Sequence, residues 1–440
     1  MISYIDNILF VIVLVLTIFL FSNNFKKILD NIRLGRAENR SDKPILRLKN
    51  MFRVAFGQGK MIRRPIAGIL HLIVYIGFII INIELLEIIV DGIFGTHRIF
   101  SQYFPGLYNI LIGSFEILAL LVLISVIIFW IRRNILKIKR FLKDEMRGWP
   151  KLDADLILYF EIILMSLFLT MNGADYTIQL NYPENDIYVR AGSFPVSQFL
   201  VPIFQDFSLN HLMLIERISW WLHILGIFIF LNYLYYSKHL HILLAFPNTY
   251  YANLESKGKF KNINTITSEV KLMLDDKNNY EDNDGSEIET FGASDVTELS
   301  WIQLLNAYSC TECGRCTSEC PANLSGKKLS PRKIMMDTRD RLTEFSKNIK
   351  LNSEEYSGDG KKLLGDYISN EEIWACTSCN ACVEACPIDI DPLSIIMSMR
   401  QYLVLEKSAA PQDLNNMMNN IENNGAPWPF NQQDRTNWIN

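Results

Sequence analysis

The sequence predicts an all-α protein in two parts, a bundle of five transmembrane helices followed by a smaller helical domain. Three observations support this fold class. Five strongly apolar stretches occupy the first half of the chain, the loops between them alternate between very basic and almost free of basic residues, and all eight cysteines lie between residues 310 and 386. A secreted protein held by disulfides spreads its cysteines differently, so this clustering favours a reducing compartment and metal ligation.

Each apolar stretch is about long enough to cross a hydrocarbon core of roughly 30 Å as a helix. The first stretch has no basic segment before it and no small-residue cleavage site, so a retained helix is favoured over a signal peptide. The chain is therefore expected to form a transmembrane domain over residues 1–246, with helices near residues 5–22, 66–90, 109–131, 154–171 and 219–245.

The charges of the loops predict the orientation of the bundle. Residues 23–65 carry twelve Lys and Arg and residues 132–153 carry eight, whereas residues 91–108 and 172–218 together carry three. Cytoplasmic loops are the ones enriched in Lys and Arg, and such loops also contact lipid headgroups. We expect a multi-pass protein of a bacterial-type inner (plasma) membrane, with its N-terminus outside and everything after the fifth helix in the cytoplasm.

Polar residues within the apolar stretches need a reason, because burying them in lipid is costly. The glutamates are interpreted first as hydrogen-bonded packing contacts or interfacial residues. They are Glu84, Glu87, Glu116 and Glu161.

The histidines suggest a cofactor. His223 and His241 are 18 residues apart, five turns at 3.6 residues per turn, which places both on one face of the fifth helix. His71 lies near the basic end of the second helix, at about the depth of His241. A haem held by two imidazoles takes one from each of two facing helices, as His71 and His241 offer. Two hydrogen-bonded histidines without a cofactor remain the alternative.

A family resemblance strengthens this interpretation. The segment WWLHILGIFIFLNYLYYSKHLHI (220–242) resembles the fifth helix of the respiratory nitrate reductase gamma subunit and of heterodisulfide-reductase-type membrane cytochromes b. That helix carries two haem-ligand histidines, matched by His223 and His241, and the second helix carries one matched by His71 in RRPIAGILHLIVYIGF (63–78).

The resemblance implies a cytochrome b-like domain with one haem b, held by His71 and His241. A second helix-two histidine of the nitrate reductase pattern falls on Ile81 in this chain. His223 is therefore half of a possible second haem site, which His97 or His211 would have to complete.

After the membrane domain, residues 247–300 are polar and too poor in apolar residues to fold alone, so a linker is expected. No GxGxxG or GxxxxGK[ST] fingerprint appears, and nothing indicates nucleic-acid binding. A cysteine-rich domain is expected over residues 301–407, followed by a C-terminal tail over residues 408–440.

Two runs carry the strongest signal in the chain, CTECGRCTSECP (310–321) and CTSCNACVEACP (376–387). Both have the C-x2-C-x2-C-x3-C-P spacing of two-cluster ferredoxins, in which the fourth cysteine of each run binds the other cluster. Zinc sites usually use two CxxC pairs instead. The predicted ligands of the two [4Fe–4S] clusters are Cys310, Cys313, Cys316 and Cys386 for the first, and Cys376, Cys379, Cys382 and Cys320 for the second.

These runs resemble the helical ferredoxin domain of the small iron–sulfur subunit of heterodisulfide reductases. Its fusion to a gamma-type cytochrome b is similar to membrane iron–sulfur reductases of the electron-transfer-flavoprotein:menaquinone oxidoreductase kind, in which two CCG domains follow. Neither CCG domain is present in the 440 residues. The resemblance implies partners, namely a CCG-domain iron–sulfur subunit, an electron-transfer flavoprotein, or both, docked through the C-terminal tail.

The predicted function is that of an electron-transfer subunit of a quinone-linked oxidoreductase complex. It would pass electrons between a cytoplasmic partner, the two clusters, haem b and a membrane quinone, with menaquinone reduction as the direction that the family implies. The candidates for a quinone pocket are basic residues expected near the haem, which as an alternative anchor lipid headgroups. They are Arg63, Arg64, Lys238 and His239.

Two other functions compete with this prediction. One is the membrane subunit of a heterodisulfide (thiol–disulfide) reductase complex, in which the thiol chemistry would belong to a partner chain because all eight cysteines are predicted cluster ligands. A non-redox membrane scaffold or sensor, in which the clusters are structural, would not be reduced by quinol or by a low-potential donor.

Overall fold

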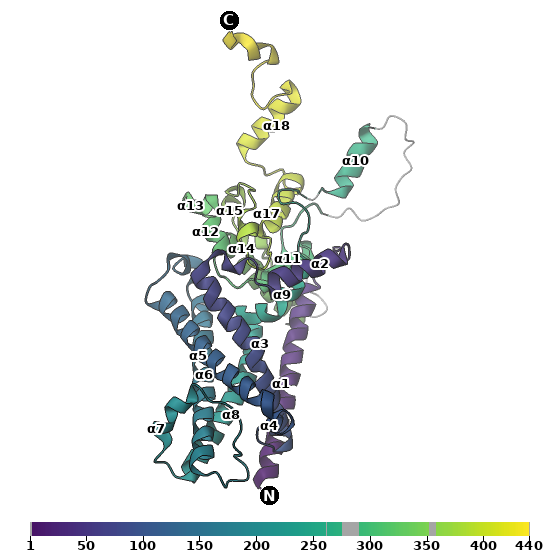
Figure 1. The fold of residues 1–440 in the computed structure, drawn as a ribbon. Coiled ribbons are helices and arrows are strands. Elements are labelled where there is room, and N and C mark those ends of the chain that lie inside the picture. The colour runs from purple at the N-terminus through teal and green to yellow at the C-terminus, as the bar shows by residue number, and fades with distance from the viewer. Residues whose placement is uncertain (1, 261, 275–289, 352–357, 440) are drawn as a thin grey trace.

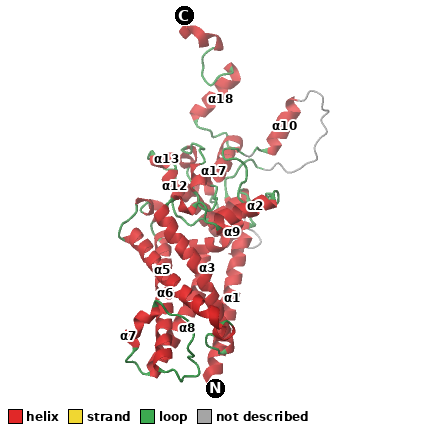
Figure 2. Cartoon of the chain, viewed as in Figure 1, coloured by secondary structure: helices red, strands yellow, loops and turns green. Residues whose placement is uncertain are grey.

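The computed structural model describes residues 2–260, 262–274, 290–351 and 358–439. The described residues form helices and loops, as Figure 2 shows. Their β-type hydrogen bonding is confined to two isolated β-bridges. This confirms the predicted all-α class.

Five helices are long and apolar enough to cross a membrane, also as predicted. They are α1 (Ile2–Ile32), α3 (Pro65–Phe94), α5 (Pro105–Asn134), α6 (Trp149–Asn181) and α8 (Leu209–Tyr233). α6 packs against α5 and α8, α3 packs against α5, and α1 packs against α3 and α8. Figure 1 shows the N-terminus at one end of this bundle and the cysteine-rich domain on the other, which we call the cluster side.

The fifth helix begins and ends earlier than predicted, because α8 runs from Leu209 to Tyr233 and not over residues 219–245. Two 3-10 turns follow, Leu234–Tyr236 and Lys238–Leu240, before α9 (His241–Tyr250). Ser237 between the turns is extended, and its side chain accepts a hydrogen bond from the His239 amide. Polar groups thus replace helical hydrogen bonds at the break, and His241 begins a new helix instead of continuing the helix of His223.

Asp153, a buried residue near the start of α6, also stabilises this break. Its carboxylate accepts hydrogen bonds from the Tyr233 hydroxyl at 2.6 Å and from the Lys238 amide at 3.1 Å. A contact with another helix therefore decides where the fifth helix ends.

The remaining helices are shorter than these five, and most of them surround the cysteine runs or connect the long helices. They are α2 (Pro44–Met51), α4 (Ile99–Tyr103), α7 (Val201–Phe204), α10 (Asn264–Leu274), α11 (Trp301–Ser309), α12 (Arg315–Glu319), α13 (Pro321–Leu324), α14 (Pro331–Leu351), α15 (Asn370–Trp374), α16 (Ala381–Ala385), α17 (Pro392–Gln401) and α18 (Gln412–Asn424). α18 extends away from the rest of the protein (Figure 1).

The end of the segment predicted as a linker is part of the folded domain. Ala293, Val296 and Leu299 are buried in the core of the cysteine-rich domain, because capping boxes at Asp295 and Ser300 fold the chain back onto it. The predicted linker also contains α10, while its residues 261 and 275–289 lie outside the described residues.

One hydrophobic core joins the two parts of the protein. It contains Ile28 and Ile32 of α1 together with residues of α9, α11, α14 and α17. Gly35 lies directly against this domain, since a Cβ at that position would come within 2.6 Å of the Trp301 amide nitrogen. The cysteine-rich domain is therefore packed on the end of the bundle and not tethered at a distance from it.

Candidate functional site

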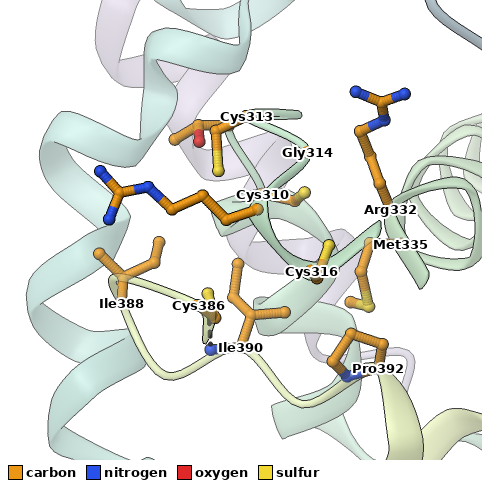
Figure 3. A pocket seen from close by; sticks show the side chains of 12 residues that line it. Cys310, Cys313, Gly314, Cys316, Arg332, Met335, Cys386, Ile388, Ile390 and Pro392 are labelled. Carbon is orange, nitrogen blue, oxygen red and sulfur yellow. Dashed lines mark hydrogen bonds between the residues drawn. The ribbon is translucent and has the colours of Figure 1, made fainter. Parts of the chain in front are cut away.

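The first site is a cavity between the two cysteine runs. Cys310, Cys313 and Cys316 of the first run line it together with Cys386, the last cysteine of the second run. Figure 3 shows their four sulfur atoms around the same space. α11 ends at Ser309, just before Cys310, and Gly314, with a positive φ of 71°, turns the chain into α12, which carries Cys316.

The other four cysteines also come from both runs. Burial, together with smaller contributions from the nearby Asp391, Cys376 and Cys320, raises the pKa of the Cys382 thiol to about 12. Cys320 follows α12, which packs against α16, the helix that carries Cys382. Cys379 is exposed. Thiols of this kind become thiolates when a cation compensates the cost of burial.

The spacing of these side chains suits a cluster better than one ion. Among the described residues, no three His, Cys, Asp or Glu side chains are close enough together to hold a single metal ion. A cubane [4Fe–4S] cluster binds each thiolate at a different iron atom, so its four ligands lie further apart than the ligands of a single metal ion. The cysteine arrangement therefore fits a cluster.

Arg400 of α17 holds the second cysteine loop in place, a role that the sequence did not reveal. Its guanidinium donates hydrogen bonds to the carbonyl oxygens of Ile373 at 2.8 Å and Cys376 at 2.5 Å, and to the Ser378 hydroxyl at 3.2 Å. It also lies over the Trp374 ring, 5.0 Å from its centroid. One side chain thus satisfies several turn carbonyls that have no helical partner.

Replacing Arg400 by Gln is expected to loosen this loop, because loss of a charged donor to buried carbonyls costs roughly 2–3 kcal/mol. The electron paramagnetic resonance signal of the cluster nearest this loop should then decay severalfold faster in air, with the other cluster unaffected. Lys407→Gln is the matched control, since it removes an exposed cation that contacts the Tyr402 ring and not the loop. Equal decay of both clusters in Arg400→Gln would contradict a local role.

The second site is a cavity of about 620 Å³ inside the bundle, within the range of roughly 300–1,000 Å³ typical of ligand pockets. Four histidines line it, His71, His223, His239 and His241. At its cluster side the cavity reaches Thr311, Cys313, Arg315 and Ile388, which also line the first cavity. The two cavities therefore share a wall.

Two of these histidines have the environment of a typical metal ligand. His241 Nδ1 lies 3.2 Å from the Lys238 carbonyl oxygen, and His223 Nδ1 lies 3.0 Å from the Leu164 carbonyl oxygen. Ligating histidines usually donate one ring N–H to such an oxygen, which leaves Nε2 for the metal. The break after α8 thus keeps His241 on the cavity although it lies on a different helix from His223.

The other two histidines have buried nitrogen atoms without partners. Within the described residues, Nδ1 of His71 and Nδ1 of His239 make no hydrogen bond. An unpaired buried polar atom costs about 1–3 kcal/mol, so a bound group that engages the His71 ring would offset this cost. His71 and His241 line the same cavity and offer imidazole nitrogens to it, so the residues present fit a haem bound between them.

His97 and His211 do not approach His223. His97 Nε2 lies 3.4 Å from the Asp175 carboxylate, and its ring is 4.7 Å from that of Tyr188. His211 is exposed, with Nδ1 3.1 Å from the Ser208 hydroxyl. Neither lines the cavity.

The four quinone-pocket candidates separate into two pairs. Lys238 and His239 line the cavity. Arg63 and Arg64 do not; they form ion pairs with Glu384 at 2.5 Å and Glu319 at 2.8 Å, on the cysteine-rich domain. The tertiary structure uses these arginines to hold the two parts of the protein together.

Glu312, between two cysteines of the first run, is ion-paired with Lys238 and, at 2.8 Å, with Arg339. Burial raises the pKa of Glu312, but the two cations outweigh burial and hold this pKa below its ordinary value. The pair Lys238–Glu312 thus connects the cysteine loop directly to the segment that carries His239 and His241.

Comparisons with known proteins support the iron–sulfur assignment of the two cysteine runs. Residues 309–390 match the family of 4Fe-4S dicluster domains. Over 98% of its length the chain is 30% identical to a probable iron–sulfur-binding oxidoreductase, FadF, of Bacillus subtilis, of which it covers 60%. Over 98% of its length it is 27% identical to the EtfAB:quinone oxidoreductase of Syntrophomonas wolfei, of which it covers 59%.

A third of the chain (33%) is 29% identical to one subunit of the dihydromethanophenazine:CoB–CoM heterodisulfide reductase of Methanosarcina mazei, covering 36% of that protein. No solved structure matches the chain. The chain thus spans about 60% of the length of its two full-length relatives. The resemblance drawn from the sequence motifs is confirmed: over nearly its whole length the chain is similar to proteins named as an iron–sulfur-binding oxidoreductase and an EtfAB:quinone oxidoreductase, and it contains a 4Fe–4S dicluster domain.

Proposed function

We propose that this chain is the membrane subunit that passes electrons between a soluble partner, two [4Fe–4S] clusters, a haem b and a membrane quinone, in the direction of quinone reduction. The observation that carries the proposal is the wall shared by the cysteine cavity and the histidine cavity. A relative named EtfAB:quinone oxidoreductase supports the choice of a quinone and of a flavoprotein donor.

The proposed ligands follow the crossed pattern. Cys310, Cys313, Cys316 and Cys386 hold the cluster next to the membrane cavity, and Cys376, Cys379, Cys382 and Cys320 hold the cluster near the surface. His71 and His241 hold the haem. These groups accept and release single electrons when bound, while the protein supplies ligands, burial and neighbouring charges that set their potentials.

The exposed Cys379 favours the surface cluster as the point where the partner docks. The partner class proposed is a CCG-domain iron–sulfur protein, an electron-transfer flavoprotein, or both. α18 and the residues after it extend from the same domain and are proposed as part of the docking surface.

Chemical reduction of the purified protein, followed by addition of a naphthoquinone, tests this function. The absorption bands of the reduced haem should be lost and the absorption of the oxidised clusters should return, with stoichiometric formation of quinol. A reduced protein that no quinone reoxidises would favour the scaffold or sensor alternative instead.

The proposed orientation puts the cluster side in the cytoplasm. The reason is the excess of Lys and Arg in the loops 23–65 and 132–153. A cysteine introduced in the loop 182–208, at the other end of the bundle, should react with a membrane-impermeant thiol reagent in intact cells, whereas a tag after residue 439 should not be accessible. The reverse labelling pattern would overturn the orientation.

A further inference from the structure

The histidine cavity continues well past the proposed haem ligands. Glu84 of α3 lines it 13 residues beyond His71, a distance of about 20 Å along the helix at 1.5 Å per residue. Glu161 of α6 and His223 of α8 line the cavity as well. We call the part around Glu84, Glu161 and His223 the deep pocket. Asn82 also lines the cavity here, and the other walls are apolar: Ile81, Leu85, Ile88, Val122, Leu164, Met165 and Phe168.

Glu84 is a buried carboxyl group that makes no hydrogen bond or ion pair within the described residues, although the charge of the buried Arg98 acts on it. It is 3% exposed, and its Oε2 makes no hydrogen bond within the described residues. Its neighbour Glu87, one turn along α3, accepts hydrogen bonds from the Phe100 amide at 2.8 Å and from the Tyr108 hydroxyl at 3.0 Å. The expected role as a packing contact therefore fits Glu87 and does not fit Glu84.

Burial of an unpartnered carboxyl costs several kcal/mol, and in membrane proteins such residues usually serve a function. Glu161 lies on the same cavity, and the described structure gives it no hydrogen bond or ion pair either. Two carboxyls that face one apolar space without partners indicate a ligand that exchanges hydrogen bonds or protons with them.

His223 supplies a third polar group to this pocket. Its Nδ1 is occupied by the Leu164 carbonyl oxygen at 3.0 Å, which leaves Nε2 free. Among the described residues no second histidine faces His223. The position where the nitrate reductase pattern has a second histidine is Ile81, which lines the cavity, and His97 and His211 lie elsewhere. The deep pocket therefore lacks the second imidazole that a bis-histidine haem needs.

We propose that the deep pocket binds the headgroup of a membrane quinone, with Glu84, Glu161 and His223 as its polar contacts. This proposal rests on the proposed function and gives the binding site of its substrate. The sequence alone suggests instead a quinone pocket among basic residues on the cluster side. A quinone headgroup has a flat apolar body and two carbonyl oxygens that accept hydrogen bonds, which matches apolar walls with three separate polar groups.

The chemistry of reduction also fits these residues. Conversion of a quinone to its quinol consumes two electrons and two protons. The electrons are those that the proposed function delivers from the soluble donor. Each of the two carboxyls, in its protonated form, gives one proton to one quinone oxygen and regains a proton from water, so both O–H bonds of the quinol are accounted for.

A binding measurement tests the location without depending on turnover. The full-length protein with its clusters and haem is titrated with the quinol analogue 2-heptyl-4-hydroxyquinoline N-oxide, whose fluorescence is quenched on binding. Glu84→Gln and His223→Phe should each weaken binding about tenfold, the effect of one lost buried hydrogen bond to a charged or polar partner. The haem spectrum should not change in Glu84→Gln.

Glu87→Gln is the matched control, since Glu87 lies one turn away and does not line the cavity; it should bind the analogue like the unaltered protein. Unchanged binding in Glu84→Gln, or weaker binding in His239→Phe alone, would move the site to the cluster side and overturn the proposal. Two haems per chain would also overturn it, because the second would fill the deep pocket. An unaltered protein that binds no analogue would refute the quinone-linked function itself.

Discussion

Replacing Cys320 by Ser is expected to destroy the cluster held by Cys376, Cys379 and Cys382, and to leave the cluster of its own run intact. Chemical analysis of anaerobically purified protein should fall from about eight iron and eight sulfide ions per chain, haem iron excluded, to about four of each. The physical reason is the interleaving of the two runs: α12 packs against α16, Cys386 lines the cavity of Cys310, Cys313 and Cys316, and Cys320 lies near Cys376 and Cys382.

Cys386→Ser is the reciprocal test. It should remove the cluster of Cys310, Cys313 and Cys316, whose cavity Cys386 lines. Because this cavity shares a wall with the histidine cavity, the Cys386 variant should also stop reduction of the haem by the soluble donor. If Cys320→Ser abolished the cluster of Cys310 and spared the other, the crossed assignment would be wrong.

Replacing His71 or His241 by Ala should abolish haem binding altogether. Each removes one of two axial ligands, and loss of one imidazole from a bis-histidine site leaves the haem weakly held in a cavity that water can enter. Pyridine haemochrome titration should give one haem per chain for the unaltered protein and none for either variant, with both clusters retained.

His239→Phe is the matched control for the haem, because His239 lies two residues from His241 and lines the same cavity. It should keep one haem. A ratio of two haems per chain in the unaltered protein would contradict the single-haem proposal and require a ligand opposite His223 that the described residues do not place there.

The strongest predictions came from patterns that are local in the sequence. A membrane helix needs about 20 apolar residues in a row because lipid offers no hydrogen bonds to the backbone, so the five spans could be counted from hydropathy. Cluster ligands follow a fixed spacing because three thiolates of one short loop bind the same cube. Both patterns involve neighbours in the chain, and both predicted the fold class.

The features that the sequence did not predict depend on partners that are distant in the sequence. The last predicted helix, near residues 219–245, breaks because Asp153 accepts a hydrogen bond from the Lys238 amide, 85 positions away. Residues near the end of the predicted linker fold because the core beneath them is apolar. Arg63 and Arg64 turn toward the cysteine-rich domain because acidic residues of that domain face them.

The sequence by itself determined the helical class, the five membrane spans and the dicluster domain, since apolar length and cysteine spacing act through adjacent residues. Only the tertiary structure decided that the cavity of the first cysteine run borders the four histidines, and that, among the described residues, Glu84 Oε2 makes no hydrogen bond where Glu87 accepts two. The physical reason is that a buried polar group is defined by the groups that surround it, and packing brings these together from distant parts of the chain.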